Sequence, residues 1–263
     1  MNTPLFDAHL HLAAKPLLPH AEEICRDLSA IGVQQVVCNG TGPDDWPDVL
    51  ALGQLHPLIL PAVGLHPWKV PQAGANWKAR FLQCLDEGAA AVGEIGLDQW
   101  IENHDIQLQQ DAFRFQLAEA VRRDLPVSIH CLRAIGPLME TLRSSPLPAR
   151  GFHLHAYNGP SELLDELLSL GAFFSFNAGQ LKPGRKRILD NLHAVPLERL
   201  LIETDAPDFL PLPEDRTHNL ADPESNHPAN LAAGYRAVAQ ARGMDADAMA
   251  AQIAVNFQGF FGK

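Results

Sequence analysis

The residues best suited to chemistry form an Asp-x-His-x-His run, Asp7–His11, directly after the apolar segment Pro4–Phe6. Because side chains two positions apart in a β-strand point to the same face, His9 and His11 can direct two imidazoles at one point. Such a pair suits a divalent metal ion and is out of place in an apolar core. Asp7 lies two positions before His9 and therefore on the same strand face, where it is expected to accept a hydrogen bond from a ligand histidine. The alternative interpretation is two ordinary surface histidines.

The elements that must position these histidines are visible as apolar runs that alternate with helix-like segments along the 263 residues. Near-continuous apolar runs are typical of parallel strands buried on both faces. Strands are predicted at about residues 4–7, 33–38, 58–64, 89–95, 126–131, 150–155, 171–176 and 199–204. Helices are predicted near residues 20–31, 44–56, 74–88, 105–124, 133–144, 160–170 and 184–193.

Eight strands alternating with helices predict an α/β fold, the (β/α)8 TIM barrel. Two extra helices near residues 228–242 and 245–258 are expected to end the chain, and a single domain is expected over residues 1–263. The clearest helix, 105–124, is predicted to bury one apolar stripe. That stripe consists of Leu108, Ala112, Phe115, Leu117, Ala118 and Val121.

In such barrels the active site lies at the C-terminal ends of the strands, and polar residues stand at six predicted strand ends. They are His9 and His11, then His66, Glu94, His130, the pair His153 and His155, and finally Asp205. A carboxylate that ends an apolar strand is costly unless it is paired or metal-bound, so Glu94 is predicted to be a ligand. His155 is favoured over His153 because it lies nearer the loop.

Each of the other candidates has a structural alternative. A satisfied core histidine is the alternative for His130, and a loop cap is the alternative for Asp205. His66 lies in a Gly-x-His-Pro turn, where it either contacts substrate or only shapes the turn.

The overall charge narrows the function classes. The chain has 31 Asp and Glu against 20 Lys and Arg, a net charge of −11, which argues against strong non-specific nucleic-acid binding. No apolar run is long enough to span a membrane, and no signal peptide is recognised. Four widely spaced cysteines, without a Cys-x-x-Cys pair, favour reduced thiols and a cytoplasmic protein.

Together these segments resemble the TatD family of metal-dependent hydrolases, often described as deoxyribonucleases. The matching segments are Asp7–His11, Gly64–Pro67, Gly93–Asp98, His130, His155, Glu203–Pro207, Asn226–Leu231 and Asn256–Phe257, spread over nearly the whole chain. The resemblance implies a TIM barrel with two divalent ions. One ion would be held by His9, His11, Glu94 and Asp205, and the second by Glu94, His130 and His155, with Glu94 as the bridge.

The chain departs from the family pattern where substrate would be bound. Leu132 stands where members often carry arginine, and Arg133 follows one position later. The segment Ala221–Ser225 is acidic where members are often basic, and His155–Gly159 replaces the usual His-Cys-Phe-Ser-Gly. The expected substrate is DNA or a small phosphoester, contacted by a changed surface.

The implied ligand set has a definite electrostatic consequence. Two divalent ions carry four positive charges and the two carboxylates carry two negative ones, so the site keeps a surplus of two positive charges. This surplus lowers the pKa of a bound water and stabilises negative charge on a phosphoryl oxygen. Asp205 is expected to orient this water or accept its proton, beside the bridging Glu94. His66 and Arg133 are expected to contact a phosphate. Zinc is the expected metal; Mn, Fe and Co also fit, and Mg is less natural with histidine ligands.

The prediction is therefore a two-metal hydrolase of phosphodiesters, with two alternatives. One is a hydrolase of small-molecule esters, lactones or amides on the same barrel. Some such barrels bridge two metals with a carboxylated lysine at strand four, whereas this strand offers Glu94. The other is a non-catalytic binding protein, against which the six retained ligand positions count.

Overall fold

Eight parallel strands follow one another around a barrel in residues 3–262, the part of the chain that this computed structural model describes. They are β1 Leu5–Leu10, β2 Val33–Asn39, β3 Ile59–Val63, β4 Ala91–Asp98, β5 Val127–Leu132, β6 Phe152–Leu154, β7 Ala172–Phe176 and β8 Leu200–Ile202. Each strand pairs in parallel with the next one in the sequence. The predicted (β/α)8 barrel is confirmed.

The seam between β1 and the end of β8 is joined by backbone hydrogen bonds. The N–H of Asp205 donates to the carbonyl of His9 at 2.9 Å, and the N–H of His11 donates to the carbonyl of Ala206 at 2.8 Å. These hydrogen bonds close the barrel and place three predicted ligands, His9, His11 and Asp205, next to one another.

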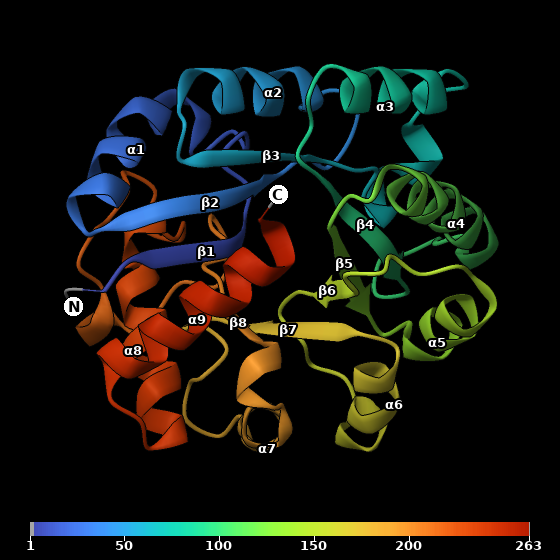
Figure 1. Ribbon diagram of the computed structural model, residues 1–263. Coiled ribbons are helices and arrows are strands. Elements are labelled where there is room, and N and C mark those ends of the chain that lie inside the picture. Colours follow the sequence, from blue (N-terminus) through green and yellow to red (C-terminus); the bar gives the residue numbers. More distant parts are fainter. Residues whose placement is uncertain (1–2, 263) are drawn as a thin grey trace.

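Helices surround the strands as an outer ring (Figure 1). They are α1 Ala21–Ala30, α2 Trp46–Leu55, α3 Trp77–Asp86, α4 Ile106–Arg123, α5 Ile135–Ser144, α6 Leu164–Ser169, α7 Lys186–Ala194, α8 Leu231–Arg242 and α9 Ala246–Phe261. The two extra C-terminal helices are thus present. Residues 1, 2 and 263 of the expected domain lie outside the described range, and the single-domain organisation stays a prediction.

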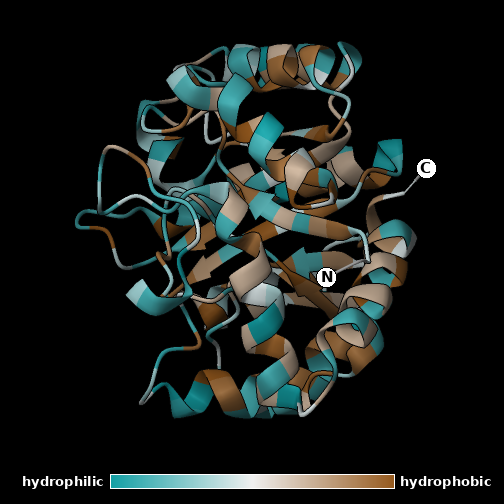
Figure 2. Ribbon diagram, turned by 90° about the vertical axis from the view of Figure 1, so that its left-hand side faces the viewer, coloured by the Kyte–Doolittle hydropathy of each residue, from teal (hydrophilic) through white to brown (hydrophobic). Residues whose placement is uncertain are grey.

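Helix α9 covers the end of the barrel at which the strands begin, and its last turn lies over the centre of the ring of strands (Figure 1). Its Phe257, Phe260 and Phe261 are buried together with the inward-facing Phe6 and Phe173. Side chains thus fill this end of the barrel. Long loops project from the opposite end, on the left of Figure 2, toward which the strands run.

The buried face of α4 differs from the predicted stripe. Leu108 is 43% exposed and Ala118 is exposed as well, whereas Gln109 and Gln116 are buried. The Gln109 amide donates to the carbonyl of Asp98 at 2.9 Å and accepts from its N–H at 2.8 Å. The predicted stripe was wrong at Leu108 and Ala118, whereas Ala112 and Leu117 are buried as expected. Glutamines take part of the buried face because strand-end backbone needs polar partners, which an apolar face cannot supply.

Replacing Gln109 with leucine is expected to destabilise the protein by about 2 kcal/mol, because the N–H and carbonyl of Asp98 lose their buried side-chain partner. In a domain of this size the loss lowers the melting temperature by roughly 4–8 °C. The matched control is Gln107→Leu on the exposed side of the same helix. Equal melting temperatures of the two variants would contradict this role of Gln109.

Two other expectations can be compared with the fold. Cys25, Cys38, Cys84 and Cys131 are all free thiols, as predicted, and the first three are buried. Among the described residues, no helix combines the length and the apolar character needed to cross a bilayer.

Candidate metal centre

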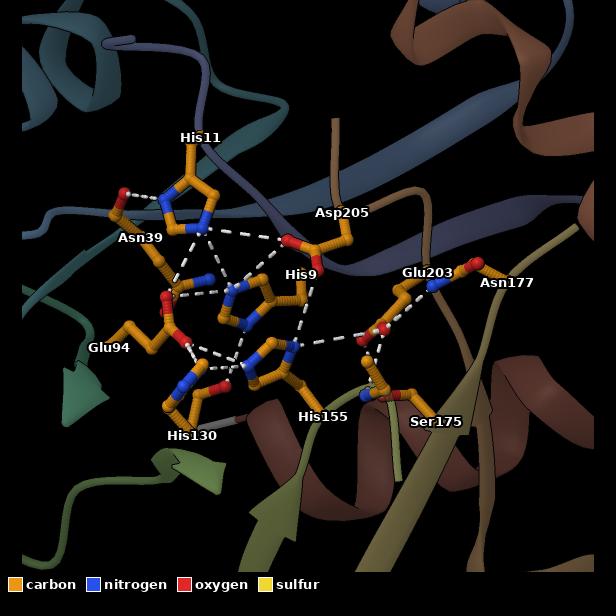
Figure 3. Close-up of polar contacts among 12 residues, drawn as sticks. His9, His11, Asn39, Glu94, His130, His155, Ser175, Asn177, Glu203 and Asp205 are labelled. Atoms are coloured by element: carbon orange, nitrogen blue, oxygen red, sulfur yellow. Dashed lines mark hydrogen bonds and ion pairs between the residues drawn. The ribbon is translucent and has the colours of Figure 1, made fainter. Parts of the chain in front are cut away.

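A cluster of histidine and carboxylate side chains lies at the loop-bearing end of the barrel. The cluster contains all six predicted ligands, namely His9 of β1, His11 just after it, Glu94 of β4, His130 of β5, His155 directly after β6 and Asp205 after β8. Their side chains converge from different strands on one region (Figure 3). The barrel thus brings together residues that are far apart in the sequence.

Glu94 lies at the centre of this cluster and is only 2% exposed. Its Oε1 is 2.7 Å from His155 Nε2 and 2.8 Å from His130 Nδ1. Its Oε2 is 3.2 Å from His11 Nε2 and 3.5 Å from His9 Nε2. The two carboxylate oxygens therefore face two different pairs of histidines, which is the arrangement a bridge between two ions requires.

Glycines make room for this arrangement. A Cβ on Gly93 would lie 2.4 Å from Asn39 Oδ1, and one on Gly96, whose φ is +143°, would lie 2.0 Å from the carbonyl of His130. A side chain at position 96 would therefore collide with the backbone of β5, and one at position 93 would displace the Asn39 side chain and crowd Ser128.

The ring nitrogens within each histidine pair have the spacing of ligands on a common ion. His9 Nε2 is 3.2 Å from His11 Nε2, and His130 Nδ1 is 3.3 Å from His155 Nε2. Two nitrogens bound to one tetrahedral ion at ~2.0–2.1 Å would be about 3.3 Å apart. The short contacts of Glu94 Oε1 lack hydrogen-bond geometry, and His155 Nδ1 is also buried without a hydrogen-bond partner among the described residues. The donor set therefore fits two divalent cations.

Two of these histidines have their other ring nitrogen fixed by a neighbour that can only accept. His11 Nδ1 is 3.0 Å from the carbonyl oxygen of Asn39, and His130 Nε2 is 2.8 Å from Asp98 Oδ2. The neutral rings therefore carry their protons on these nitrogens. Their lone pairs point toward Glu94, as metal ligands require.

Asp205 lies across the cluster from Glu94 (Figure 3). Its Oδ1 is 3.5 Å from His11 Nε2, and its Oδ2 is 3.6 Å from His155 Nδ1. Its φ is +51°, a left-handed conformation that aspartate adopts more readily than most residues. The carboxylate is thereby turned into the site immediately after β8 ends.

Burial and charge act in opposite directions on the ionisable groups. Burial favours neutral carboxyls, but His155 and neighbouring histidines hold the pKa of Glu94 well below its usual range and that of Asp205 at about 2. Burial likewise disfavours charged imidazoles, yet the two carboxylates raise the pKa of His155 to about 9 and that of His11 well above its usual value. Protons on histidines thus balance the carboxylates, and binding of divalent cations would release them.

His66, a predicted substrate contact, also reaches the cluster. It is 5% exposed, and its Nε2 is 3.5 Å from Glu94 Oε1. Its Nδ1 accepts a hydrogen bond from the N–H of Trp68 at 3.1 Å. A neutral His66 therefore carries its proton on Nε2 and can donate it to a ligand in the site, which fits a substrate contact better than a metal ligand.

A cavity of about 750 Å³ opens over the cluster. Besides the cluster, it is lined by two cations, Lys69 and Arg185, and by the aromatic rings of Trp68, Trp100 and Phe209. Both cations are exposed, and neither forms an ion pair with any residue in the range 3–262. The entrance thus combines unpaired positive charge with exposed aromatic surface.

The structure does not bring Arg133 to this cavity. Arg133 is exposed and is not among the described residues that line the cavity, where Arg185 lies. Asp7 also differs from expectation, because its carboxylate accepts from the backbone N–H of His9 at 3.1 Å and from Thr204 Oγ1 at 2.5 Å. It therefore joins β1 to the end of β8 and does not orient a ligand ring.

Beneath the ligands lie four buried polar residues, Ser128, His153, Ser175 and Glu203. Of these, only His153 was considered from the sequence, as the less favoured alternative to His155, and no role was predicted for the other three. Three of the four precede a predicted ligand by two positions and so share its face, a signal that was available in the sequence. Ser175 and the rim residues Trp68, Trp100 and Arg185 carry no such signal.

Comparisons with known proteins point in one direction. A family model described as TatD related DNase matches residues 6–262. The chain is 29% identical over 247 residues to YjjV of Escherichia coli K12, described as an uncharacterized metal-dependent hydrolase, covering 93% of this chain and 92% of that protein. It is 28% identical over 265 residues to the 3'-5' ssDNA/RNA exonuclease TatD of Erwinia tasmaniensis, covering 98% and 99%. The crystal structure of E. coli YjjV superposes with a TM-score of 0.90 at 27% identity over the full length of both chains.

Proposed function

This chain belongs to the TatD related DNase family, and we propose that its six clustered ligands hold two divalent ions that hydrolyse a phosphodiester bond in single-stranded nucleic acid. It is a metal-dependent hydrolase that acts on ester bonds. The number of ions, the ligand assignment and the substrate are the parts proposed here. Hydrolysis of small-molecule esters, lactones or amides is not favoured by these relatives.

The main support for this proposal is the position of the Glu94 carboxylate between two pairs of histidines. One oxygen faces His130 and His155, and the other faces His9 and His11. The first ion would be held by His9, His11, Glu94 and Asp205, and the second by Glu94, His130 and His155. Nitrogen-rich ligands without thiolates favour zinc, with Mn, Fe or Co as substitutes.

When bound, such ions lower the pKa of a coordinated water and neutralise charge on the phosphoryl oxygens. The residues of this chain supply the rest. Asp205 has one oxygen near His9 and His11 and the other near His155 Nδ1, and it is positioned to orient the attacking water and accept its proton. The Nε2–H of His66 points into the same space and can donate to a phosphoryl oxygen. Lys69 and Arg185 offer unpaired charge to phosphates further along a strand.

The rim favours a single strand over a duplex. Trp68 and Trp100 are 44% and 53% exposed, and their ring centroids are 6.4 Å apart. Unpaired bases stack on such rings irrespective of sequence, whereas bases in a duplex are already stacked. A net charge of −11 further disfavours binding by phosphate contacts alone. The name of the Erwinia relative, an ssDNA/RNA exonuclease, agrees with this choice.

Replacing Trp100 with alanine is expected to raise KM for a single-stranded oligonucleotide by about tenfold and to change kcat little, because a stacked base contributes ~1–3 kcal/mol. Steady-state kinetics on a labelled oligonucleotide measure both constants. Leu55→Ala, which removes another exposed apolar side chain away from the cavity, is the control. An unchanged KM in Trp100→Ala would remove the stacking role.

A substrate panel tests the proposed function as a whole. Metal-replete protein is incubated with a single-stranded oligonucleotide, the matching duplex, a small phosphodiester, a carboxylic ester and a lactone. Phosphodiester hydrolysis that is fastest on the single strand and is abolished by a chelator is expected. Faster turnover of the ester or lactone, or hydrolysis that persists after metal removal, would contradict the proposal.

A further inference from the structure

A row of four buried polar residues crosses the barrel interior beneath the candidate metal centre. They are Ser128 of β5, His153 of β6, Ser175 of β7 and Glu203 after β8, called here the buried relay. All four are at most 1% exposed. On its other side His153 meets Phe260 and Phe261 of α9, with ring centroids 6.4 Å and 6.1 Å away. The relay thus lies between an apolar plug and the ligands.

The relay is continuous from a ligand histidine to a carboxylate. His9 Nδ1 is 2.8 Å from Ser128 Oγ, which is 3.2 Å from His153 Nδ1. His153 Nε2 is 2.6 Å from Ser175 Oγ, and the Ser175 hydroxyl donates to Glu203 Oε2. Figure 3 shows Ser175 and Glu203 next to His155, on the side of the cluster away from Glu94.

The proposed metal centre gives the relay one direction. His9 Nε2 lies 3.2 Å from His11 Nε2 and 3.5 Å from Glu94 Oε2, so it is the nitrogen that would face an ion, and the ring proton is then on Nδ1. Ser128 accepts the hydrogen bond of this Nδ1–H and donates to the bare Nδ1 of His153. His153 donates from Nε2 to Ser175, whose hydroxyl donates to Glu203.

The surroundings of Glu203 favour its role as the final acceptor. Its Oε1 accepts from the N–H of Ala156 at 2.9 Å and from the Asn177 amide at 3.4 Å. Together with the Ser175 hydroxyl on Oε2, three donors therefore meet its two oxygens.

We propose that the buried relay positions His9 as a metal ligand by holding its proton on Nδ1, so that Nε2 faces the ion that His9 would share with His11. This inference rests on the proposed function, because it assumes a metal centre. None of the four residues is expected to touch substrate; they are positioning residues, and the relay does for His9 what Asn39 does for His11 and Asp98 does for His130.

Four variants test the relay by metal binding, without use of activity. Ser128→Ala removes its first hydroxyl, and His153→Leu removes both nitrogens. His153→Gln keeps one acceptor and one donor. Thr141→Val is the matched control, because Thr141 is also fully buried and hydrogen-bonded but lies on α5, outside the relay. Each metal-free, full-length protein is titrated with Mn²⁺ against a competing chelator dye, and its melting temperature is recorded in EDTA.

Loss of an outer hydrogen bond to a metal ligand typically weakens binding by ~10–100-fold, and we expect this loss for one bound ion in Ser128→Ala and His153→Leu. His153→Gln and Thr141→Val are expected to bind as wild type does, whatever their melting temperatures. Wild-type affinity in Ser128→Ala would overturn the relay, and so would an equal loss in Thr141→Val. Should His153→Leu fail to fold, Ser128→Ala decides the outcome.

The metal titration separates this inference from the proposed function. If the wild-type chain binds no Mn²⁺, the proposed function fails. If the wild-type chain binds Mn²⁺ and Ser128→Ala binds it equally well, the proposed function stands and the relay is overturned.

Discussion

Replacing Glu94 with glutamine is expected to reduce kcat by about 10³-fold or more and to lower the bound metal from two ions to one or fewer per chain. The substitution keeps the size of the side chain but removes its charge and turns one oxygen into an amide nitrogen. That nitrogen cannot bind an ion, and the pair of cations loses its bridge. Elemental analysis of metal-replete protein and single-turnover kinetics measure the two effects.

The control for Glu94→Gln is Glu87→Gln, an exposed glutamate just after α3. It is expected to keep wild-type metal content and rate. The bridging assignment would be abandoned if Glu94→Gln retained two ions and full activity. A variant with two ions but no activity would limit Glu94 to a role in the reaction itself.

Asp205→Asn is expected to lower kcat by about 10²–10⁴-fold, the range typical of a removed general base, while KM changes little. Asparagine can still coordinate through its oxygen but cannot accept the proton of the attacking water. Metal content is therefore expected to stay at two ions while kcat falls, whereas both fall in Glu94→Gln.

Asp190→Asn serves as the control for Asp205→Asn, because Asp190 is exposed and, among residues 3–262, forms an ion pair with Lys186 of the same helix alone. Rates are compared at saturating metal so that weaker binding is compensated. A kcat for Asp205→Asn within a few fold of wild type would rule out Asp205 as the proton acceptor and leave it as a ligand only.

The barrel and the six clustered residues were predictable because their signals are local. Buried parallel strands appear as apolar runs, and ligands at their ends interrupt those runs with residue types that a core rejects. His9 and His11 share one strand face because they are two residues apart, and Glu94 interrupts the apolar run of β4. Such patterns require no knowledge of which strands are neighbours.

The partners of those residues were less predictable because they depend on which strands are adjacent. The polar contact of His9 is Ser128, four strands away in the sequence, and that of His11 is the carbonyl of Asn39. Periodicity on α4 pointed to an apolar stripe, yet the backbone of Asp98 required Gln109 on that face. Requirements of this kind arise only once the barrel has closed.

The residues that contact substrate are the part of the site that is hardest to predict from residue spacing in the sequence. Arg133 was predicted as a phosphate contact because it lies one position after the place where family members often carry arginine. The arginine that lines the cavity, Arg185, comes instead from the segment before α7. Loops over a barrel are placed by their own packing, so a residue two or three positions after a ligand can point away from the site.

The most direct test of the two-ion centre is an anomalous difference map from crystals grown with Mn²⁺ or Zn²⁺. Two peaks ~3.5–4 Å apart are expected on either side of the Glu94 carboxylate. One should lie within bonding distance of the Nε2 atoms of His9 and His11, and the other near His130 Nδ1 and His155 Nε2. A single peak, or two peaks without Glu94 between them, would contradict the proposed centre.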